Sequence, residues 1–545
     1  MADRPMALWV DGVASPDRVD DDVTRPLSVC LITEGSYPHY RGGVSTWCHM
    51  LISGLPEVRF SLVSLVADPS AEPVYDLPDN VIQLKTVPLW GTGEVLELQR
   101  HLSLREVLRH KLRTPQGTIE SVFVPLFAEF MDLLWSPESD SERFAGVLQE
   151  MAAYFTRFDY DVTLKSAPVW QTFLETSARG YERVEGRGSF QAEVSLLDVT
   201  NTLRLLYRWL TVLTLQLPEV DVIHAASGGL CSMPAIAAAN RRDTAFLLTE
   251  HGIYLRERLL ALSRSDAGWF EQVLQAAFAQ KVTQASYAVA DQIAPGSNYN
   301  HRWQLYNGAL AHSIQTIYNG PDPSEFTPAR HNKPLGESPT ITWLGRIDPL
   351  KDLETLIRAA AIVVKEVPDV RFVLYGKAPR GNEWYQERCL ALRDDLGLQQ
   401  NVIFGGFAAS AAAAYNEGDF VVLSSISEGF PYSVVEAMMC GRTVVGTDVG
   451  GVSEALDGVG IVVEPRNPEE LAAGMLQLLR DPLLAQVWGE QARARALERF
   501  SLQQCNAAYL SLYQRLVTET AQRTTEPSPL NSWGVLCREG LYESV

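Results

Sequence analysis

The sequence lacks the features that mark nucleic-acid-binding and membrane-spanning proteins. Its 545 residues include 46 Lys and Arg but 66 Asp and Glu, which gives a net charge of −20. A broad surface for nucleic acid needs an excess of Lys and Arg, so we expect no nucleic-acid partner. No apolar run approaches the roughly 18 residues that cross a bilayer, and the N-terminus has no apolar segment of signal-peptide length. We therefore expect a cytoplasmic protein with no direct membrane span.

The sequence also has few signs of a disulfide framework or a metal centre. Its 7 cysteines are scattered, odd in number and without a CxxC pair, which is typical of reduced, buried thiols in a cytosolic protein. No group of His and Cys residues has the spacing of zinc ligands. We therefore predict no metal site and no cofactor.

Length and composition indicate more than one globular domain. A chain of 545 residues with 46% hydrophobic and 21% charged residues can bury sizeable cores but exceeds the length of one ordinary domain. Residues 1–26 are acidic and are expected to form a flexible leader, and residues 521–545 are expected to form a polar tail. The polar segment 328–338 contains Pro and Gly and is expected to link two domains.

Strands that alternate with helices predict parallel βαβ units in both domains. In the first domain, residues 27–327, we expect strands at Leu27–Thr33, Arg59–Val66, Val81–Val87, Val220–Ala225, Ala245–Thr249, Gln292–Pro295 and Ser313–Tyr318. A long segment at about residues 89–218 breaks the alternation with helical patterns, and we interpret it as a helical insertion in this domain.

The alternation continues in the second domain, residues 335–480. Strands are expected at Thr340–Leu344, Arg371–Tyr375, Asn401–Phe404, Phe420–Leu423 and Thr443–Gly446, and residues 481–520 are expected to be helical. The predicted fold class is therefore α/β, with two Rossmann-like domains that face each other across a cleft.

Two carboxylates follow one of these strands at a spacing that suits a hydroxyl-rich ligand. Glu428 lies on the loop after Phe420–Leu423, and Glu436 lies early in the helix that Pro431 can start. Both should lie at the carboxyl end of a parallel sheet, where α/β proteins bind ligands. Carboxylates accept strong hydrogen bonds from hydroxyls, and backbone N–H groups near Tyr432–Val434 can hold a phosphate. From these residues alone, it is equally open that Glu428 is an ordinary loop charge and Glu436 an ordinary helix charge, with no shared function.

A second cluster, residues 345–352, also joins a strand to a helix. Gly345 permits a ligand to approach the backbone closely, and Arg346 and Lys351 lie at the same edge of the predicted sheet. Two cations there can neutralise a diphosphate, in a bound substrate and in a departing group. Taken alone, the pair is also typical of solvated surface charges.

The first domain supplies two further candidates. Gly42 and Gly43 lie in the loop after the first strand, where they can bring the backbone close to a phosphate or an acceptor. The loop matches neither GxGxxG nor a P-loop, and an ordinary tight turn also fits it. His251 follows the strand Ala245–Thr249 and could bind a sugar hydroxyl across the cleft, although a lone His is more often structural. In a two-domain arrangement these clusters would converge.

Taken together, these segments resemble glycosyltransferase family 4, which has the GT-B fold. The resemblance rests on Glu428-x7-Glu436, on Gly345-Arg346 with Lys351, on Gly42-Gly43-Val44, and on Asn319-Gly320-x-Asp322 with Phe326. Within the first domain, Glu34-Gly35-Ser36-Tyr37-Pro38 and Thr249-Glu250-His251-Gly252-Ile253-Tyr254 look like the soluble glycosyltransferases of bacterial Pel exopolysaccharide synthesis. This resemblance covers roughly residues 27–520.

The resemblance implies a retaining, metal-independent hexosyltransferase. It would move a sugar from a UDP-sugar, with UDP-glucose favoured, to a growing exopolysaccharide of Pel type, as found in biofilms. The UDP-sugar is then a co-substrate and not a cofactor. The absence of a convincing DxD motif agrees with this, because Asp20-Asp21-Asp22 lies in the expected leader and not after a core strand.

The resemblance also implies roles for single residues. Arg346 and Lys351 would bind the donor diphosphate, Glu436 the ribose and Glu428 the donor sugar, and His251 would lie beside the donor sugar or the reacting centre. The predicted catalytic residues are Glu428, His251, Arg346 and Lys351. The predicted donor-binding residues are Gly42, Gly43, Gly345, Arg346, Lys351, Glu428, Gly429, Phe430, Tyr432, Ser433, Val434 and Glu436.

Two other functions remain open from the sequence. One is a nucleotide-sugar epimerase of the same fold, and the other is a catalytically silent scaffold that binds a UDP-sugar. The expected partners of the transferase are a saccharide acceptor and the membrane proteins of a polysaccharide synthase, which would hold the protein at the inner membrane. The insertion at residues 89–218 is our candidate for contacts with those proteins.

Overall fold

The computed structural model describes residues 25–91, 103–138, 140–185, 194–239, 243–329 and 338–525. Most of the expected leader, linker and tail lies outside these ranges, as does the Asp20-Asp21-Asp22 segment. Within them, no helix combines the length and the apolar character needed to cross a bilayer.

The first domain contains a parallel sheet of six strands in the order β3-β2-β1-β4-β5-β6. The strands are β1 Ser28–Glu34, β2 Arg59–Val66, β3 Val81–Pro88, β4 Val222–Ala225, β5 Ala245–Glu250 and β6 Gln292–Pro295. β1 and β5 are nearly continuous apolar runs, as expected for parallel strands with helices on both faces. The helices of this domain outside the β3–β4 connection are α1 Gly43–Gly54, α9 Met233–Ala238, α10 Tyr254–Leu262, α11 Trp269–Val289 and α12 His301–Tyr306.

The second domain repeats this topology with strand order β12-β11-β10-β7-β8-β9. Its strands are β7 Thr340–Leu344, β8 Arg371–Tyr375, β9 Val402–Gly406, β10 Phe420–Leu423, β11 Val444–Thr447 and β12 Ile461–Val463. Its helices are α13 Leu353–Glu366, α14 Glu383–Asp395, α15 Ala411–Glu417, α16 Tyr432–Met439, α17 Val452–Leu456 and α18 Pro468–Arg480. The strand order reverses between β1 and β4 and again between β7 and β10, and such points bind ligands in open α/β sheets.

The fold class expected from the sequence is confirmed, and one predicted strand is wrong. The other expected strands are present to within two residues at either end. At Ser313–Tyr318 the structure has only an isolated bridge between Ile314 and Ile293. The neighbouring β6 ends at Pro295, which has no N–H to donate, so a parallel ladder cannot continue there.

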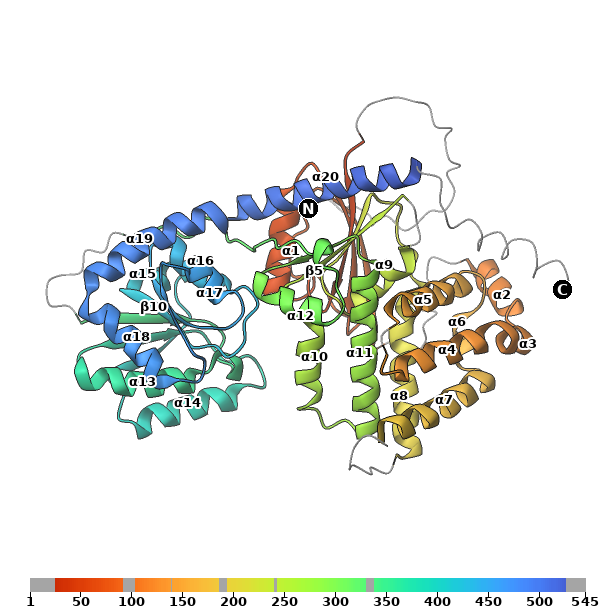
Figure 1. Cartoon of the computed structure of the whole chain (residues 1–545), viewed down its shortest axis with the longest axis horizontal. Coiled ribbons are helices and arrows are strands. Elements are labelled where there is room, and N and C mark those ends of the chain that lie inside the picture. The colour runs from red at the N-terminus through yellow and green to blue at the C-terminus, as the bar shows by residue number, and fades with distance from the viewer. Residues whose placement is uncertain are drawn as a thin grey trace.

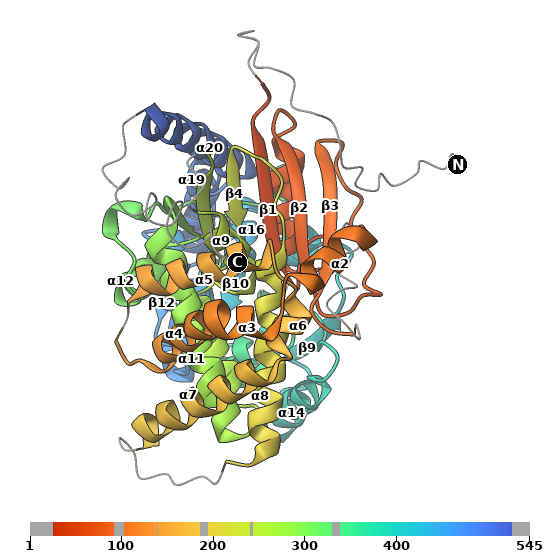
Figure 2. The same cartoon turned by 90° about the vertical axis from the view of Figure 1, so that its right-hand side faces the viewer.

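The connection from β3 to β4 is helical in its described residues. It contains α2 Leu104–Leu112, α3 Gln116–Thr118, α4 Val124–Trp135, α5 Ser141–Phe155, α6 Tyr160–Leu164, α7 Ala167–Glu185 and α8 Leu196–Trp209. These helices gather at the side of the first sheet that is remote from the second domain (Figure 1 and Figure 2). Phe123, Phe127 and Met151 are fully buried in one apolar cluster with Ile32 and Val63 of the sheet. The helical segment therefore shares its core with the first domain.

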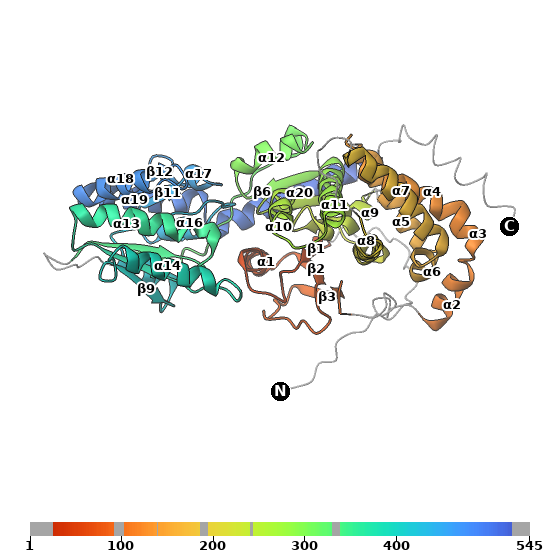
Figure 3. The same cartoon turned by 90° about the horizontal axis from the view of Figure 1, so that it is seen from below.

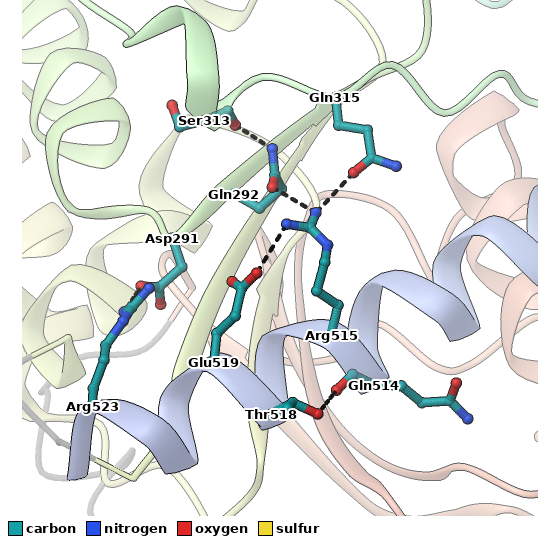
Figure 4. Close-up of polar contacts among 9 residues, drawn as sticks. All are labelled: Asp291, Gln292, Ser313, Gln315, Gln514, Arg515, Thr518, Glu519 and Arg523. Atoms are coloured by element: carbon teal, nitrogen blue, oxygen red, sulfur yellow. Dashed lines mark hydrogen bonds and ion pairs between the residues drawn. The ribbon is translucent and has the colours of Figure 1, made fainter. Parts of the chain in front are cut away.

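The C-terminal helices connect the two domains. After α19 Pro482–Arg499, helix α20 Leu502–Thr525 runs across the first domain (Figure 1). Tyr509 and Leu516 pack in the same apolar cluster as Leu31 of β1. In Figure 4, Arg515 Nη2 donates to the side-chain oxygens of Gln292 and Gln315, each at 2.8 Å, and Arg523 pairs with Asp291. The first domain is thus completed by the last helix of the chain.

Candidate functional site

A cleft of about 440 Å³ separates the two domains. Helices α10 and α12 of the first domain face the second domain in both Figure 1 and Figure 3. They form one wall of the cleft, and the loops after β7 and β10 form the other. The lining residues are Gly252, Ile253, Arg256, Glu257, Leu260, Ala261, Arg264, Tyr299, Asn300, Trp303, Arg346, Asp348, Leu350, Lys351, Ser427, Glu428 and Gly429.

Lys351 and Glu428 meet in this cleft at the switch point of the second sheet. Lys351 follows β7 and Glu428 follows β10, so the reversal of strand order brings them together. Lys351 Nζ donates to Glu428 Oε1 at 2.5 Å, and Ser425 Oγ donates to the same oxygen at 2.6 Å. Backbone contacts hold the two loops, because Ile426 N donates to Leu350 O at 2.9 Å. The pair is therefore positioned before any ligand arrives.

Arg346 adds a second cation to the same wall. Its side chain is 72% exposed and lies 3.9 Å from the carboxylate of Asp348. The neighbouring Gly345 packs tightly, since a Cβ there would lie 3.0 Å from the Trp343 ring. Arg346 can therefore move to meet an anion, whereas the space beside Gly345 is filled by the Trp343 ring.

His251 lies at the end of β5, next to cleft residue Gly252. Asn319 Nδ2 lies 3.2 Å from His251 Nδ1, so the amide donates to Nδ1 and the ring proton is on Nε2. Nε2 is buried and has no hydrogen-bond partner among the described residues. Burial lowers the pKa of His251 to about 4. The imidazole is thus a neutral donor at physiological pH.

Gly42 and Gly43 lie at the start of α1 and do not line the cavity. Both are exposed, and a Cβ at either position would meet nothing within 4 Å. Packing within the chain therefore does not require glycine there. The same helix supplies Trp47, whose ring packs on that of His251 with centroids 4.4 Å apart.

Glu436 lies outside the cavity, within α16. Tyr415 OH donates to its Oε2 at 2.7 Å, and burial raises the pKa of Glu436 to about 7. At the start of this helix, the Val434 N–H already donates to Pro431 O at 3.2 Å. The first-turn N–H groups of Tyr432 and Ser433 have no intrahelical acceptor, and these are the donors that a phosphate could use.

Gly429 and Phe430 bring the two domains into contact. A Cβ on Gly429 would lie 2.2 Å from His251 O, so only glycine allows this approach of the two backbones. Phe430 is buried and packs on Tyr318 and Phe500, with ring centroids 5.0 and 5.1 Å away. Its side chain therefore supports the domain contact and does not line the cavity.

Sequence reasoning missed the wall that the first domain contributes. Asn300 Nδ2 and Trp303 Nε1 are buried donors beside the cleft, and neither has a hydrogen-bond partner among the described residues. Arg256 Nη1 reaches across the cleft to Ser427 Oγ at 3.0 Å. Glu454 of α17 accepts hydrogen bonds from the N–H groups of Asn298 and Tyr299 at 2.9 and 2.6 Å. These two bonds hold the backbone just before Asn300 and α12. Arg256 lies two residues after Tyr254 and belongs to the segment that carries the family resemblance, but it was assigned no role, and Asn300 and Trp303 carry no sequence signal.

A buried carboxylate supports this wall from behind. Glu250 is fully buried at the end of β5 and accepts from Tyr287 OH at 2.5 Å and from Gln304 Nε2 at 3.1 Å. Burial raises the pKa of Glu250 to about 7. Since Gln304 belongs to α12, this network fixes α12 on β5.

Two family models match the chain. The model described as a domain of unknown function, DUF3492, matches residues 27–312, which contain the first sheet and the helical connection. The model described as glycosyl transferases group 1 matches residues 338–481, which contain the second sheet.

The curated relatives match over part of their length. The D-inositol 3-phosphate glycosyltransferase of Segniliparus rotundus is 32% identical over 219 residues, 38% of this chain and 48% of that protein. The poly(ribitol-phosphate) alpha-N-acetylglucosaminyltransferase of Staphylococcus aureus is 28% identical over 188 residues, 34% of this chain and 37% of that protein. The chain therefore spans about half, or less, of the length of these relatives.

Solved structures share the architecture over nearly the whole chain. The sucrose-phosphate synthase of Thermosynechococcus elongatus has a TM-score of 0.57 at 17% identity and covers 90% of this chain and 100% of its own. Anabaena HepE in complex with UDP has a TM-score of 0.55 at 16% identity, with the same coverage of 90% and 100%. This likeness shows that the chain has the GT-B fold.

Proposed function

The chain belongs to the DUF3492 family, and from that premise we propose that it is a retaining glycosyltransferase that moves a sugar from a UDP-sugar to a growing exopolysaccharide. The group 1 glycosyl transferase match of the second domain supports transfer. The segments around Glu34 and His251 resemble PelF, which supports a polymer of Pel type, UDP-glucose as the favoured donor and a reaction without metal. In this proposal the enzyme works in the cytoplasm beside membrane polysaccharide-synthase partners.

The observation that carries the proposal is the Lys351–Glu428 pair at the switch point, with Arg346 on the same wall. When a diphosphate enters the cleft, Lys351 exchanges its ion pair with the single carboxylate of Glu428 for an ion pair with the doubly charged diphosphate. Lys351 and Arg346 then stabilise the charge that grows on the departing nucleotide. Glu428, released from Lys351, accepts hydrogen bonds from the donor sugar.

The nucleotide extends along α16 in this proposal. The Tyr432 and Ser433 N–H groups face the phosphates, where the helix dipole favours negative charge. Glu436 accepts hydrogen bonds from the ribose hydroxyls. Because Tyr415 OH occupies only one of its oxygens in the described contacts, the carboxylate keeps further acceptor capacity.

The acceptor saccharide binds to the opposite wall. Asn300 Nδ2 and Trp303 Nε1 can donate to its hydroxyl groups, and Arg256 can do the same when it leaves Ser427. Unsatisfied buried donors are costly, so a hydroxyl-rich ligand would relieve that cost. In this proposal the second-domain wall binds the donor and the first-domain wall binds the acceptor.

Transfer then proceeds through an oxocarbenium-like state. The bond between the anomeric carbon and the diphosphate oxygen breaks, and the acceptor oxygen forms a bond to that carbon from the same face. The acceptor proton leaves with the UDP. His251 Nε2–H donates to the sugar or to the leaving group, and closure of the domains excludes water.

The proposal is tested by incubating the protein with UDP-glucose and other UDP-sugars, with and without oligosaccharide acceptors, and analysing the products. UDP release coupled to a lengthened saccharide supports it. A new UDP-sugar formed without acceptor would instead show an epimerase, and binding without any turnover would show a scaffold.

A further inference from the structure

Helix α2 exposes an apolar stripe. Leu104, Leu108 and Leu112 are 75%, 51% and 83% exposed. Residues in an α-helix follow each other at about 100°, so the spacing of four places the three leucines on one face. No residue of α2 is buried, yet the stripe covers the whole length of the helix. Scattered single apolar residues are normal on a surface, but an ordered row is not.

Cations border this stripe on both sides. Arg105, Arg109 and Arg113 form a parallel row about 100° from the leucines, and Lys111 lies about 60° to the other side of Leu108. A surface hollow beside the helix is lined by Leu104, Arg105, Leu108, Arg109, Leu112 and Arg113. Across residues 104–113 the four cations face one acid, Glu106, while the whole chain carries a net charge of −20. The helix is therefore a local basic site on an acidic protein.

The start of α2 is capped within the helix, and the segment after its end is attached to the neighbouring helical residues. Ser103 and Glu106 form a capping box, in which the Ser103 N–H donates to Glu106 Oε2 at 2.7 Å and the Glu106 N–H donates to Ser103 Oγ at 3.3 Å. Beyond its C-terminus, the Asp159 N–H donates to Thr114 Oγ1 at 2.8 Å, and Thr114 is buried. The C-terminal end of α2 is thus attached to the domain, and its leucine face is exposed.

From this geometry we propose that α2 binds the surface of an anionic phospholipid bilayer. The leucines enter the boundary between headgroups and acyl chains, and the flanking Arg and Lys side chains contact lipid phosphates. The basic side chains of the helix complement the negative lipid headgroups, and its leucines complement the apolar acyl chains below the headgroups. The binding would keep the interdomain cleft close to the membrane at which an exopolysaccharide is exported, and it does not depend on which sugar is transferred.

The experiment is flotation of the full-length protein with vesicles of phosphatidylglycerol and phosphatidylcholine, and with vesicles of phosphatidylcholine alone. We expect binding to the anionic vesicles that weakens with salt. Two variants test the two parts of the surface: Leu104→Ser with Leu112→Ser, and Arg105→Gln with Arg109→Gln. Each should weaken binding by about tenfold or more.

Leu483→Ser is the matched control, because Leu483 is 69% exposed but lies on α19, remote from α2. It should bind as the wild type does. All four substitutions on α2 replace exposed side chains, and circular dichroism checks that the variants fold. The proposal is overturned if the wild type does not float with anionic vesicles, or if both double variants float as well as the wild type. Since the assay measures no sugar transfer, its outcome is separate from that of the proposed activity.

Discussion

Lys351 and Glu428 contact each other at 2.5 Å across the point where the strand order of the second sheet reverses. Each lies on a loop that follows a different strand, and the two loops are joined by the hydrogen bond from Ile426 N to Leu350 O. In the absence of ligand, the carboxylate therefore holds the ammonium group at the place where a diphosphate is proposed to bind.

Replacement of Lys351 by Ala removes one charge-assisted hydrogen bond to the diphosphate. Such bonds contribute roughly 1.5–3 kcal/mol, so kcat/KM for the UDP-sugar should fall about 10- to 100-fold. The measurement is UDP release under steady-state conditions. Lys365→Ala is the control, because Lys365 is exposed in the last turn of α13 at the opposite edge of the sheet. Equal rates for Lys351→Ala and wild type would show that Lys351 does not bind the donor.

His251 should act as a hydrogen-bond donor and not as a base. Its pKa is lowered to about 4 by burial, so it stays neutral at pH 5.5 and above. We expect His251→Leu to lower kcat by roughly 10-fold or more, while His251→Gln, which keeps an N–H donor near the position of Nε2, retains more activity. The measurement is kcat as a function of pH from 5.5 to 8 for the wild type and His251→Gln. If the wild type shows a titration in this range that is absent from His251→Gln, His251 ionises there and the proposed role is wrong.

Gly429 should be sensitive to the smallest side chain. A Cβ there would lie 2.2 Å from His251 O, so Gly429→Ala must displace the loop that carries Glu428. Displacements of about 1 Å can cost up to about 100-fold in rate, and we expect a fall of at least about tenfold in kcat. Gly117→Ala is the control, because a Cβ there meets nothing within 4 Å. A Gly429→Ala enzyme as active as this control would show that the contact is not needed.

Most strands of the two sheets could be predicted from the sequence. Parallel strands that are buried on both faces consist of continuous apolar residues, as in Phe420–Leu423. The sequence did not predict β12, whose three residues Ile461–Val463 are too short to show a pattern. The loops after β7 and β10 could be singled out because their charged residues directly follow strands. Asn300 and Trp303 could not, since their place beside the cleft depends on tertiary contacts: α12 is attached to β5 through Gln304 and Glu250, and the backbone before α12 is attached to Glu454 of α17.

Glu250 should make the stability of the protein depend on pH. Burial raises its pKa from 4.5 to about 7, so the folded state binds this proton more tightly than the unfolded state. The resulting stability is fully present below pH 4.5, is lost as the pH rises through about 7, and amounts to at most about 3 kcal/mol.

Urea unfolding at pH 5 and pH 8 measures this effect. Glu250→Gln keeps an oxygen that accepts from Tyr287 and Gln304 but cannot ionise, so its free energy of unfolding should fall less between the two pH values than that of the wild type. If both proteins lose the same free energy over this range, Glu250 is not the group responsible.

The most direct test of the donor site is calorimetric titration of UDP, without added metal, into the wild type and Glu436→Ala at pH 8, where the Glu436 carboxyl group, with its pKa of about 7, is ionised. GDP and ADP serve as comparison ligands. We expect UDP to bind the wild type and GDP and ADP to bind more weakly. Glu436→Ala should bind UDP at least about tenfold more weakly, because the ribose loses its charged acceptor. If no nucleotide binds, or if the variant binds UDP as tightly as the wild type, the proposed donor site is wrong.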